Sequence, residues 1–595
     1  MNFWIVKLGI SQLTETEQRI FNNEVSNYLN KKVQINLNFQ KKNTHLISYS
    51  VHPTKNYHSV SNDLFGFSGL LVGHSDLSID LRNAGKISEK LVNIGDITDL
   101  ANGQFSLYQT CNGSFECIVD RLGSYKVFYF THNEHVYVTN FTRVISELKP
   151  SKPNIEFYIN FIATGGTYGN YTDDQEVNTL PESGRLKWSA HEGLIIDQYA
   201  SMNDLYEPEG AYEELLERAA LSMKNSAKYL TKYHEVALSL SGGFDSRLVL
   251  EMYADSSNRN IQTFTFPDNA LDEKLAKKVA KSYGFSHVVL NPSSMPDLTE
   301  MTQFSESNLA PYRNYDNVVG YIFDESYRSH FTDSNYVILN GNGGDIDDYG
   351  IKKFKNLDQI SEFDAIDSLL QKIVNKEILT DAGYKQIYEH LKKYYLSKYS
   401  PLLKGKGNHH KLRLLYFIFE RFGNYQGYKF FINYFKEDLY LPFSNPDFVR
   451  VSMSPLRQEL MRSEPESLHR HLSTIFMNGR KRAIPFSSSE HWDIGTLHRY
   501  NKRIGHYLHQ KFLKRFDKPA IKYSSKIRSE FFDQNLKYYK EVIHNSTDSS
   551  IWSFIDREHV QSLLNDENFK YYKGGELLSK IIPLLNSGRL DNFKI

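Results

Sequence analysis

The stretch EVALSLSGGFDSRLVLEMYA, residues 235–254, places two adjacent glycines between an apolar run and an amphipathic segment. Residues 236–240 predict a short buried strand, and apolar side chains such as Leu248 and Met252 then recur at helical spacing. The glycines therefore lie in a strand-to-helix turn. Their backbone N–H groups can point into one concavity, to which the helix adds unpaired amides and the positive end of its dipole. We predict that this turn binds an anion.

The composition limits the classes of partner. The chain has 595 residues, which predicts two or three domains, and its 70 Lys and Arg balance its 70 Asp and Glu. Because there is no net positive charge, we expect neither a nucleic-acid nor a membrane partner. Cys111 and Cys117 form neither a zinc-ligand pattern nor a disulfide framework, which indicates a reducing compartment. With no targeting segment and no apolar run of membrane-spanning length, a cytoplasmic protein is expected.

The sequence pattern changes once along the chain. In the earlier part, segments such as CIVDRLGSYKVFYFT and HVYVTNF alternate in the way of half-buried strands. After a connector that contains Pro208 and Gly210, residues 212–230 carry apolar side chains largely on one helical face. We therefore predict a β-rich first domain over residues 1–205 and a second domain over residues 206–595.

The second domain alternates strands with helices. Residues 261–266 and 286–291 predict strands on either side of a helix, and residues 336–340 predict a strand that runs into a second glycine-rich turn. Such alternation predicts a parallel sheet, whose ligands bind outside the carboxyl ends of its strands. Both glycine-rich turns follow such ends. From about residue 355 to 595 the chain is mostly amphipathic helix, which we interpret as a helical extension.

Several motifs resemble those of one enzyme family. SGGFDS, residues 241–246, resembles the pyrophosphate-binding loop of the N-type ATP pyrophosphatases, which cleave ATP between its α- and β-phosphates; a Walker loop is absent from the sequence. LNGNGGDIDDYG, residues 339–350, resembles the SGEGADE loop of asparagine synthetases and the corresponding loop of β-lactam synthetases. Further similar segments are PDNALDEKLAKKVAKSYGFSH, LYLPFSNPDFVRVSMSPL, NGQFSLYQTCNGSFECIVDRLGSYKVFYF and TLPESGRLKW. Over roughly residues 95–460, the chain resembles the asparagine-synthetase-like family.

The resemblance implies a fold for each domain. The first would be an Ntn-hydrolase-like β-rich sandwich, and the second an adenine-nucleotide α-hydrolase-like parallel-sheet domain with a helical extension, so the fold class is α/β. Glutamine-hydrolysing members expose a Cys at position 2 as nucleophile, whereas this chain has Asn2. We therefore expect no glutaminase activity. In that respect the chain resembles β-lactam and carbapenam synthetases and lasso-peptide cyclases, which draw the amine from the substrate itself.

The resemblance also implies site residues. Asp245 and Asp345 would be catalytic and would hold Mg²⁺, which prefers one or two carboxylates plus phosphate oxygens. We expect both to pair with metal rather than with protein side chains. Lys481 is the candidate for stabilising acyl transfer, although Arg480 and Arg482 lie as close and a solvated basic cluster is the alternative. The expected nucleotide-binding residues are Ser239, Ser241, Gly242, Gly243, Asp245, Ser246, Phe266 and Gly341.

Some positions leave alternatives open. Asn342 stands where family members often carry Glu or Tyr, and an amide cannot act as a base at neutral pH, so a replacement base would have to lie elsewhere. Arg247 stands where Ser is usual, and it is expected either to touch phosphate or to be a solvated cation in the first helical turn. A helix cap is the alternative role for Asp345.

The activity that the resemblance implies is ATP-dependent amide formation. The enzyme would adenylate a small-molecule or peptide carboxylate, using ATP and Mg²⁺, and an amine would displace AMP. An amine from the substrate itself would give a lactam or macrolactam. Amidation of a small acid or sugar acid with free ammonia stays open, as does a non-catalytic nucleotide-binding homologue. A homodimer, or a partner from the same biosynthetic pathway, is a further open possibility.

Overall fold

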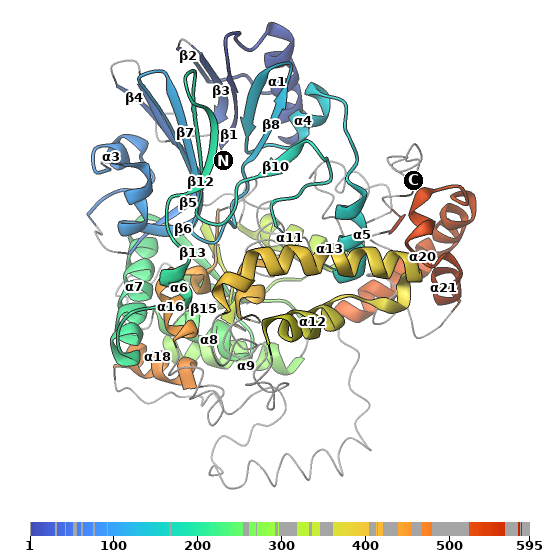
Figure 1. Cartoon of the computed structure of the whole chain (residues 1–595). Coiled ribbons are helices and arrows are strands. Elements are labelled where there is room, and N and C mark those ends of the chain that lie inside the picture. Colours follow the sequence, from blue (N-terminus) through green and yellow to red (C-terminus); the bar gives the residue numbers. More distant parts are fainter. Residues whose placement is uncertain are drawn as a thin grey trace, which may run out of the picture.

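A computed structural model describes most of the chain. The described residues are 2–29, 32–41, 43–50, 56–60, 63–74, 78–91, 93–165, 169–253, 261–268, 270–291, 295–296, 318–331, 336–344, 361–403, 412, 414–420, 438–454, 467–478, 523–565, 581–582 and 585. Within them, antiparallel sheets come first along the chain and a parallel sheet follows, so the protein has a mixed α/β fold (Figure 1).

Two six-stranded antiparallel sheets form the N-terminal part. Their strand orders are β10-β8-β9-β1-β3-β2 and β12-β11-β7-β6-β5-β4. The strands are β1 (Asn2–Leu8), β2 (Leu37–Lys41), β3 (Thr44–Ser50), β4 (Tyr57–Val60), β5 (Asp63–Gly73), β6 (Ala101–Cys111), β7 (Ser114–Val119), β8 (Phe128–His132), β9 (His135–Thr139), β10 (Val177–Thr179), β11 (Gly184–Ser189) and β12 (Gly193–Gln198). Trp4 on β1 and Tyr108 on β6 are fully buried, with ring centroids 5.0 Å apart. The two sheets therefore pack face to face through aromatic side chains.

In the described part of the chain, four helices accompany these sheets. They are α1 (Glu15–Leu29), α3 (Ala84–Ser88), α4 (Arg143–Leu148) and α5 (Ile155–Thr164). Helix α1 buries Phe21, Val25 and Tyr28, which recur at helical spacing and so form its apolar face. Helix α5 is buried over most of its length and ends at Gly165, whose left-handed backbone (φ 72°) terminates the helix.

Five parallel strands form the sheet of the later part, in the order β15-β14-β13-β16-β17. They are β13 (Glu235–Ser239), β14 (Ile261–Thr265), β15 (Ser286–Val289), β16 (Tyr336–Leu339) and β17 (Asp438–Tyr440). The first four correspond to the strands that the sequence predicts, whereas the three-residue β17 was not expected. Val236, Ala237 and Leu238 are fully buried, as in a strand that is covered on both faces. The first glycine-rich turn thus leaves the central strand of the sheet.

Helices surround the parallel sheet and continue the chain beyond it. They are α6 (Asn203–Tyr206), α7 (Tyr212–Tyr233), α8 (Phe244–Glu251), α9 (Ala270–Tyr283), α11 (Val318–Phe331), α12 (Glu362–Ile373), α13 (Asp381–Tyr399), α16 (Pro446–Met453), α18 (Ser467–Met477), α20 (Tyr523–Asn545) and α21 (Arg557–Leu563). Short 3-10 helices are η1 (Ile94–Asp99), η5 (Lys376–Ile378), η6 (Ser400–Leu402), η8 (Pro442–Ser444) and η10 (Ser550–Ser553). Across the described ranges, a helix with the length and apolar character needed to cross a membrane does not occur.

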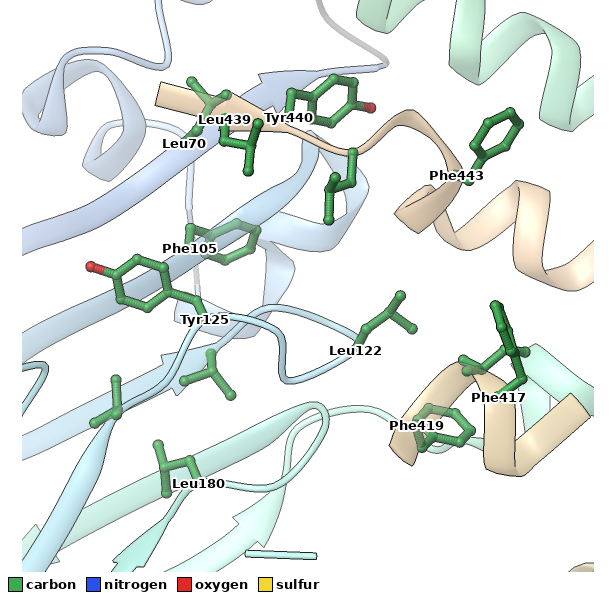
Figure 2. Packing of buried hydrophobic residues seen from close by; sticks show 14 of the residues in the cluster. Leu70, Phe105, Leu122, Tyr125, Leu180, Phe417, Phe419, Leu439, Tyr440 and Phe443 are labelled. Carbon is green, nitrogen blue, oxygen red and sulfur yellow. The ribbon is translucent and has the colours of Figure 1, made fainter. Parts of the chain in front are cut away.

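The antiparallel and parallel parts share buried contacts. Figure 2 shows Leu70 of β5 near Leu439 of β17, and these two strands contact each other. The Tyr440 hydroxyl donates a hydrogen bond to Asn102 Oδ1 at 2.9 Å, and this contact is buried. Because buried polar groups are costly unless they are paired, this bond stabilises the link between Tyr440 of β17 and Asn102 of β6.

Candidate functional site

The first glycine-rich turn leads from β13 into α8. The Ser246 hydroxyl accepts a hydrogen bond from Ser241 N–H at 3.0 Å, and the Ser241 hydroxyl accepts one from Gly243 N–H at 3.1 Å. Gly243 directly precedes α8 and supplies no side-chain cap for the helix. Hydroxyls and backbone N–H groups thus gather at the positive end of a helix. Such an arrangement can bind phosphate.

An acidic side chain lies against the same turn. Gly242 N–H donates to Asp272 Oδ1 at 3.1 Å, and a Cβ on Gly242 would lie 2.5 Å from that oxygen. Asp272 belongs to the first turn of α9, which follows the neighbouring strand β14. A carboxylate oxygen and a phosphate oxygen are both acceptors, so Asp272 holds an amide that an anionic ligand can also use.

The second glycine-rich turn lies directly beside the first. Strands β13 and β16 pair in parallel, so both turns leave the same edge of the sheet. A Cβ on Gly341 would lie 2.8 Å from Ser246 N, and a Cβ on Gly344 would lie 2.4 Å from Asp245 Oδ1. Both distances are shorter than a real Cβ tolerates, so this close approach requires glycine. Two segments far apart in the sequence therefore meet at the Asp245 carboxylate.

Asp245 also has a protein partner. His469 Nε2 lies 2.8 Å from Asp245 Oδ1, and the two side chains are 6% and 32% exposed. This corrects the expectation that Asp245 pairs only with metal: helix α18, which carries His469, packs against α8. The imidazole ring packs against Phe443, with ring centroids 5.9 Å apart. The carboxylate is thus held by a buried histidine while part of its surface stays open to solvent.

Two further expected nucleotide-binding residues lie at the same end of the sheet. Ser239 is the last residue of β13, and Phe266 directly follows the neighbouring strand β14; both are half-buried. The Phe266 ring stacks on Phe323 of α11, with centroids 4.2 Å apart and planes 8° apart. A stacked pair of aromatic rings therefore lies where strand β14 ends, next to the end of β13.

Two of the expected catalytic residues, Asp345 and Lys481, lie outside the described residues, as do Arg480 and Arg482. Asp345 follows Gly344 directly in the sequence. Asn342 is described and exposed, and its N–H donates to Asn340 Oδ1 at 3.0 Å.

Arg247 is buried between packed helices and is not exposed to solvent. Its residue exposure is 3%, which overturns the expectation of a solvated cation. Burial lowers the pKa of Arg247, and the charge of Glu251, one turn further along α8, raises it. Glu251 in turn accepts from the Tyr283 hydroxyl of α9 at 3.0 Å and from the Ser473 hydroxyl of α18. These contacts tie three helices together behind the first turn.

Asp272 and His469 are the two side chains at this site to which the sequence assigned no role. For Asp272 a signal existed, because it lies in a segment that resembles the asparagine-synthetase-like family and at the start of a helix after a strand. For His469 no local pattern pointed to the site, since the contact depends on how α18 packs against α8.

The described residues fit a magnesium ion that arrives with a nucleotide. In the part of the chain that the structure covers, no three His, Cys, Asp or Glu side chains group to hold a metal by themselves. Mg²⁺ needs no such cage, because it usually binds one or two carboxylates together with water and phosphate oxygens. The partly open Asp245 carboxylate, beside a turn suited to phosphate, fits one such ligand.

A comparison with known protein families identifies the family of this chain. The family model described as asparagine synthase matches residues 224–536, more than half of the 595 residues. The chain belongs to the asparagine synthase family. Enzymes of this family are carbon–nitrogen ligases that use ATP, typically with Mg²⁺. At this general level, the protein is an ATP-dependent enzyme of the ligase or amidotransferase type.

No curated protein matches the chain. The solved structures that match it have low sequence identity to it. Among solved structures, glutamine phosphoribosylpyrophosphate amidotransferase from B. subtilis, complexed with ADP and GMP, is 9% identical; the match covers 57% of this chain and 81% of that one, with a TM-score of 0.22. The allosteric regulatory enzyme of purine biosynthesis is 10% identical, with coverages of 57% and 74% and a TM-score of 0.23. At such TM-scores, neither structure supports a conclusion about this chain.

Proposed function

We propose that the protein is an amide-forming ligase that releases AMP and pyrophosphate. An oxygen of a substrate carboxylate attacks the α-phosphorus of ATP, and the bond from that phosphorus to the pyrophosphate oxygen breaks. An amine nitrogen then attacks the acyl carbon, the bond to AMP breaks, and the amine loses a proton. The amide, AMP and pyrophosphate are the products.

The observation that carries this proposal is the meeting of two glycine-rich turns at one carboxylate. Gly341 and Gly344 approach Asp245 so closely that neither position has room for a Cβ. The arrangement provides an anion-binding turn and an acidic metal ligand at the carboxyl edge of a parallel sheet, where such folds bind ligands. The sequence has no Walker lysine for transfer of the γ-phosphoryl group, which favours loss of pyrophosphate as a unit.

The proposed roles follow from these positions. The first turn holds the β- and γ-phosphates at the N-terminus of α8 and so stabilises the charge that develops on the leaving pyrophosphate. Asp245 and Asp345 hold Mg²⁺, which when bound neutralises part of that charge. Lys481 stabilises acyl transfer. The phosphate-binding residues are Ser241, Gly242, Gly243 and Ser246, and the nucleotide site is completed by Ser239, Phe266 and Gly341.

In this proposal the first domain, residues 1–205, is an Ntn-hydrolase-like sandwich without glutaminase activity, and residues 206–595 are the adenine-nucleotide α-hydrolase-like synthetase domain. The Cys117 thiol is fully buried, and burial raises its pKa well above the usual range, which makes it a poor nucleophile. Cys111 is exposed at the end of β6. We propose that the amine belongs to the substrate itself, as in the β-lactam synthetases and lasso-peptide cyclases that the chain resembles.

The products of ATP cleavage test the proposal. Purified protein is incubated with Mg²⁺, ATP and candidate carboxylates that carry an amine, and nucleotides and phosphates are separated. AMP and pyrophosphate should form in equal amounts with the amide, and omission of the carboxylate should nearly stop turnover. ADP and orthophosphate from the correct substrate would contradict both the mechanism and the bond assignment. The Asp245→Asn variant is the blank for contaminating ATPases.

The same assay identifies the source of the amine. Carboxylates without an amine are supplied with ammonium or with glutamine, and glutamate release is measured separately. Turnover that needs added ammonium would replace ring closure with free-ammonia amidation. Release of glutamate above the enzyme-free blank would show that a glutaminase is present. Failure to bind Mg-ATP at all would favour a non-catalytic homologue.

A further inference from the structure

His469 reaches the centre of the proposed site from a helix that carries no recognised motif. Its Nε2 lies 2.8 Å from Asp245 Oδ1, the same oxygen that a Cβ on Gly344 would meet at 2.4 Å. The imidazole of His469 and Gly344 of the second turn therefore both lie close to the same carboxylate oxygen. Among the described residues, no other side chain forms an ion pair or hydrogen bond with the Asp245 carboxylate, which is 32% exposed.

Packing alone does not account for a histidine at this position. Leu468, Leu472 and Phe476 of the same helix are fully buried and already supply the apolar face of α18. The buried His469 Nε2 lies 2.8 Å from the carboxylate, which is 32% exposed, without the alignment of a regular hydrogen bond, so the contact is an electrostatic one. The histidine thus connects the core of α18 to an acidic group at the edge of the sheet.

We propose that His469 is a positioning residue that orients Asp245 for the metal. By holding Oδ1 it fixes the rotamer of the carboxylate and presents Oδ2 to the Mg²⁺ that accompanies ATP. A ligand that is already oriented loses less conformational freedom when it binds, so the metal binds more tightly. Groups that orient metal ligands in this way typically change metal affinity by about 10–100-fold when they are removed. The inference rests on the proposed function and adds control of metal affinity by α18.

The test measures metal binding and not turnover. Mn²⁺ is titrated into the full-length protein in the presence of an ATP analogue with a methylene group between the α- and β-phosphorus, and free Mn²⁺ is followed by electron paramagnetic resonance. His469→Leu should weaken Mn²⁺ binding by about 10–100-fold. Affinity for the same analogue without metal, measured in excess chelator, should not change, because His469 acts through the metal ligand.

Two further variants separate positioning from general damage. His469→Gln keeps a nitrogen that can face the same oxygen, so it should restore most of the Mn²⁺ affinity. His471→Leu, on the same helix, removes the 3.1 Å hydrogen bond between that imidazole and the Tyr212 hydroxyl but does not touch Asp245. It should bind Mn²⁺ like the wild type. Thermal unfolding of each variant reports any loosening of α18.

The outcomes distinguish this inference from the proposed function. Unchanged or tighter Mn²⁺ binding by His469→Leu overturns the positioning role, and so does equal weakening by His471→Leu. Asp245→Asn tests the metal site itself: if it binds Mn²⁺ like the wild type, the proposed site is wrong and the inference falls with it. If Asp245→Asn abolishes binding and His469→Leu does not weaken it, only the inference fails. A wild type that binds no Mn²⁺ with the analogue overturns both.

Discussion

Gly344 lies against the Asp245 carboxylate so closely that one methyl group would displace it. A Cβ at this position would stand 2.4 Å from both Cγ and Oδ1 of Asp245. We predict that Gly344→Ala shifts the carboxylate by about an ångström and slows pyrophosphate release by about 10²-fold, because catalytic geometry tolerates little displacement. The rate is measured with saturating ATP and Mg²⁺ and with the substrate identified by the product assay.

A glycine elsewhere in the chain provides the matched control. A Cβ on Gly95 would meet its nearest neighbour, Tyr199, at 3.5 Å, which is an ordinary van der Waals distance. Gly95→Ala should therefore keep the wild-type rate, and both variants should keep a wild-type melting temperature. Full activity of the Gly344→Ala variant would show that the second turn is not part of the active site.

At the scale of elements, the central strands could be predicted because each is a short apolar run that ends at a turn. The runs at residues 236–240, 261–266 and 336–340 are observed as β13, β14 and β16. Strand β17 was missed because it has only three residues, and its extended form depends on pairing with β16. Such a strand leaves no periodicity that a sequence pattern can detect.

The same distinction applies to the candidate site. The two glycine-rich turns carry their own local signal, and the rule that parallel strands end at one edge predicts that they lie near each other. Asp272 lies in a family-like segment, but its contact with Gly242 could not be predicted, and neither could the contact of His469 with Asp245, because each depends on where a helix packs. The sequence therefore predicts where the two turns lie, but not the contacts that Asp272 of α9 and His469 of α18 make with the first turn.

The turn between β7 and β8 gives a prediction about pH. Asp120 is 2% exposed and accepts hydrogen bonds from Leu122 N–H, Ser124 N–H, the Ser124 hydroxyl and Tyr125 N–H, at 3.1, 3.1, 3.0 and 2.6 Å. Burial raises the pKa of Asp120 from 3.8 to about 6. Between about pH 4 and pH 6 the folded protein therefore holds a proton that the unfolded chain has lost, so the contribution of Asp120 to stability falls as pH rises.

Asp120→Asn removes this titration. The stability of the wild type relative to the variant should decrease by about 2 kcal/mol between pH 4 and pH 6.5, because each unit of pKa shift corresponds to about 1.4 kcal/mol and the unfolded carboxyl is already largely ionised at pH 4. Thermal unfolding of both proteins across that range provides the measurement. Asp548→Asn, at an exposed position, should show no such trend relative to the wild type. A constant difference between wild type and Asp120→Asn would mean that Asp120 does not titrate in this range.

At the scale of the whole molecule, the two parts should lose their structure together. The Tyr440 hydroxyl donates to Asn102 Oδ1 across the junction, and both residues are buried. Tyr440→Phe leaves that oxygen without this donor, which should cost about 1–3 kcal/mol. Because the bond joins β17 to β6, hydrogen exchange should accelerate in peptides from both strands. Faster exchange in β17 alone, or two separate calorimetric transitions, would show that the parts unfold independently. Tyr538→Phe, in α20, is the control.

The short strand β17 has one more consequence, for any attempt to divide the protein. Among the described residues it is the last strand of the parallel sheet, and β5 of the first part lies against it. A bare sheet edge is a template for pairing with another chain, and such pairing leads to aggregates. A fragment that begins after the first part would present this edge together with the apolar Leu439 to its neighbours. The contact between β5 and β17 therefore keeps this edge apart from other copies of the chain.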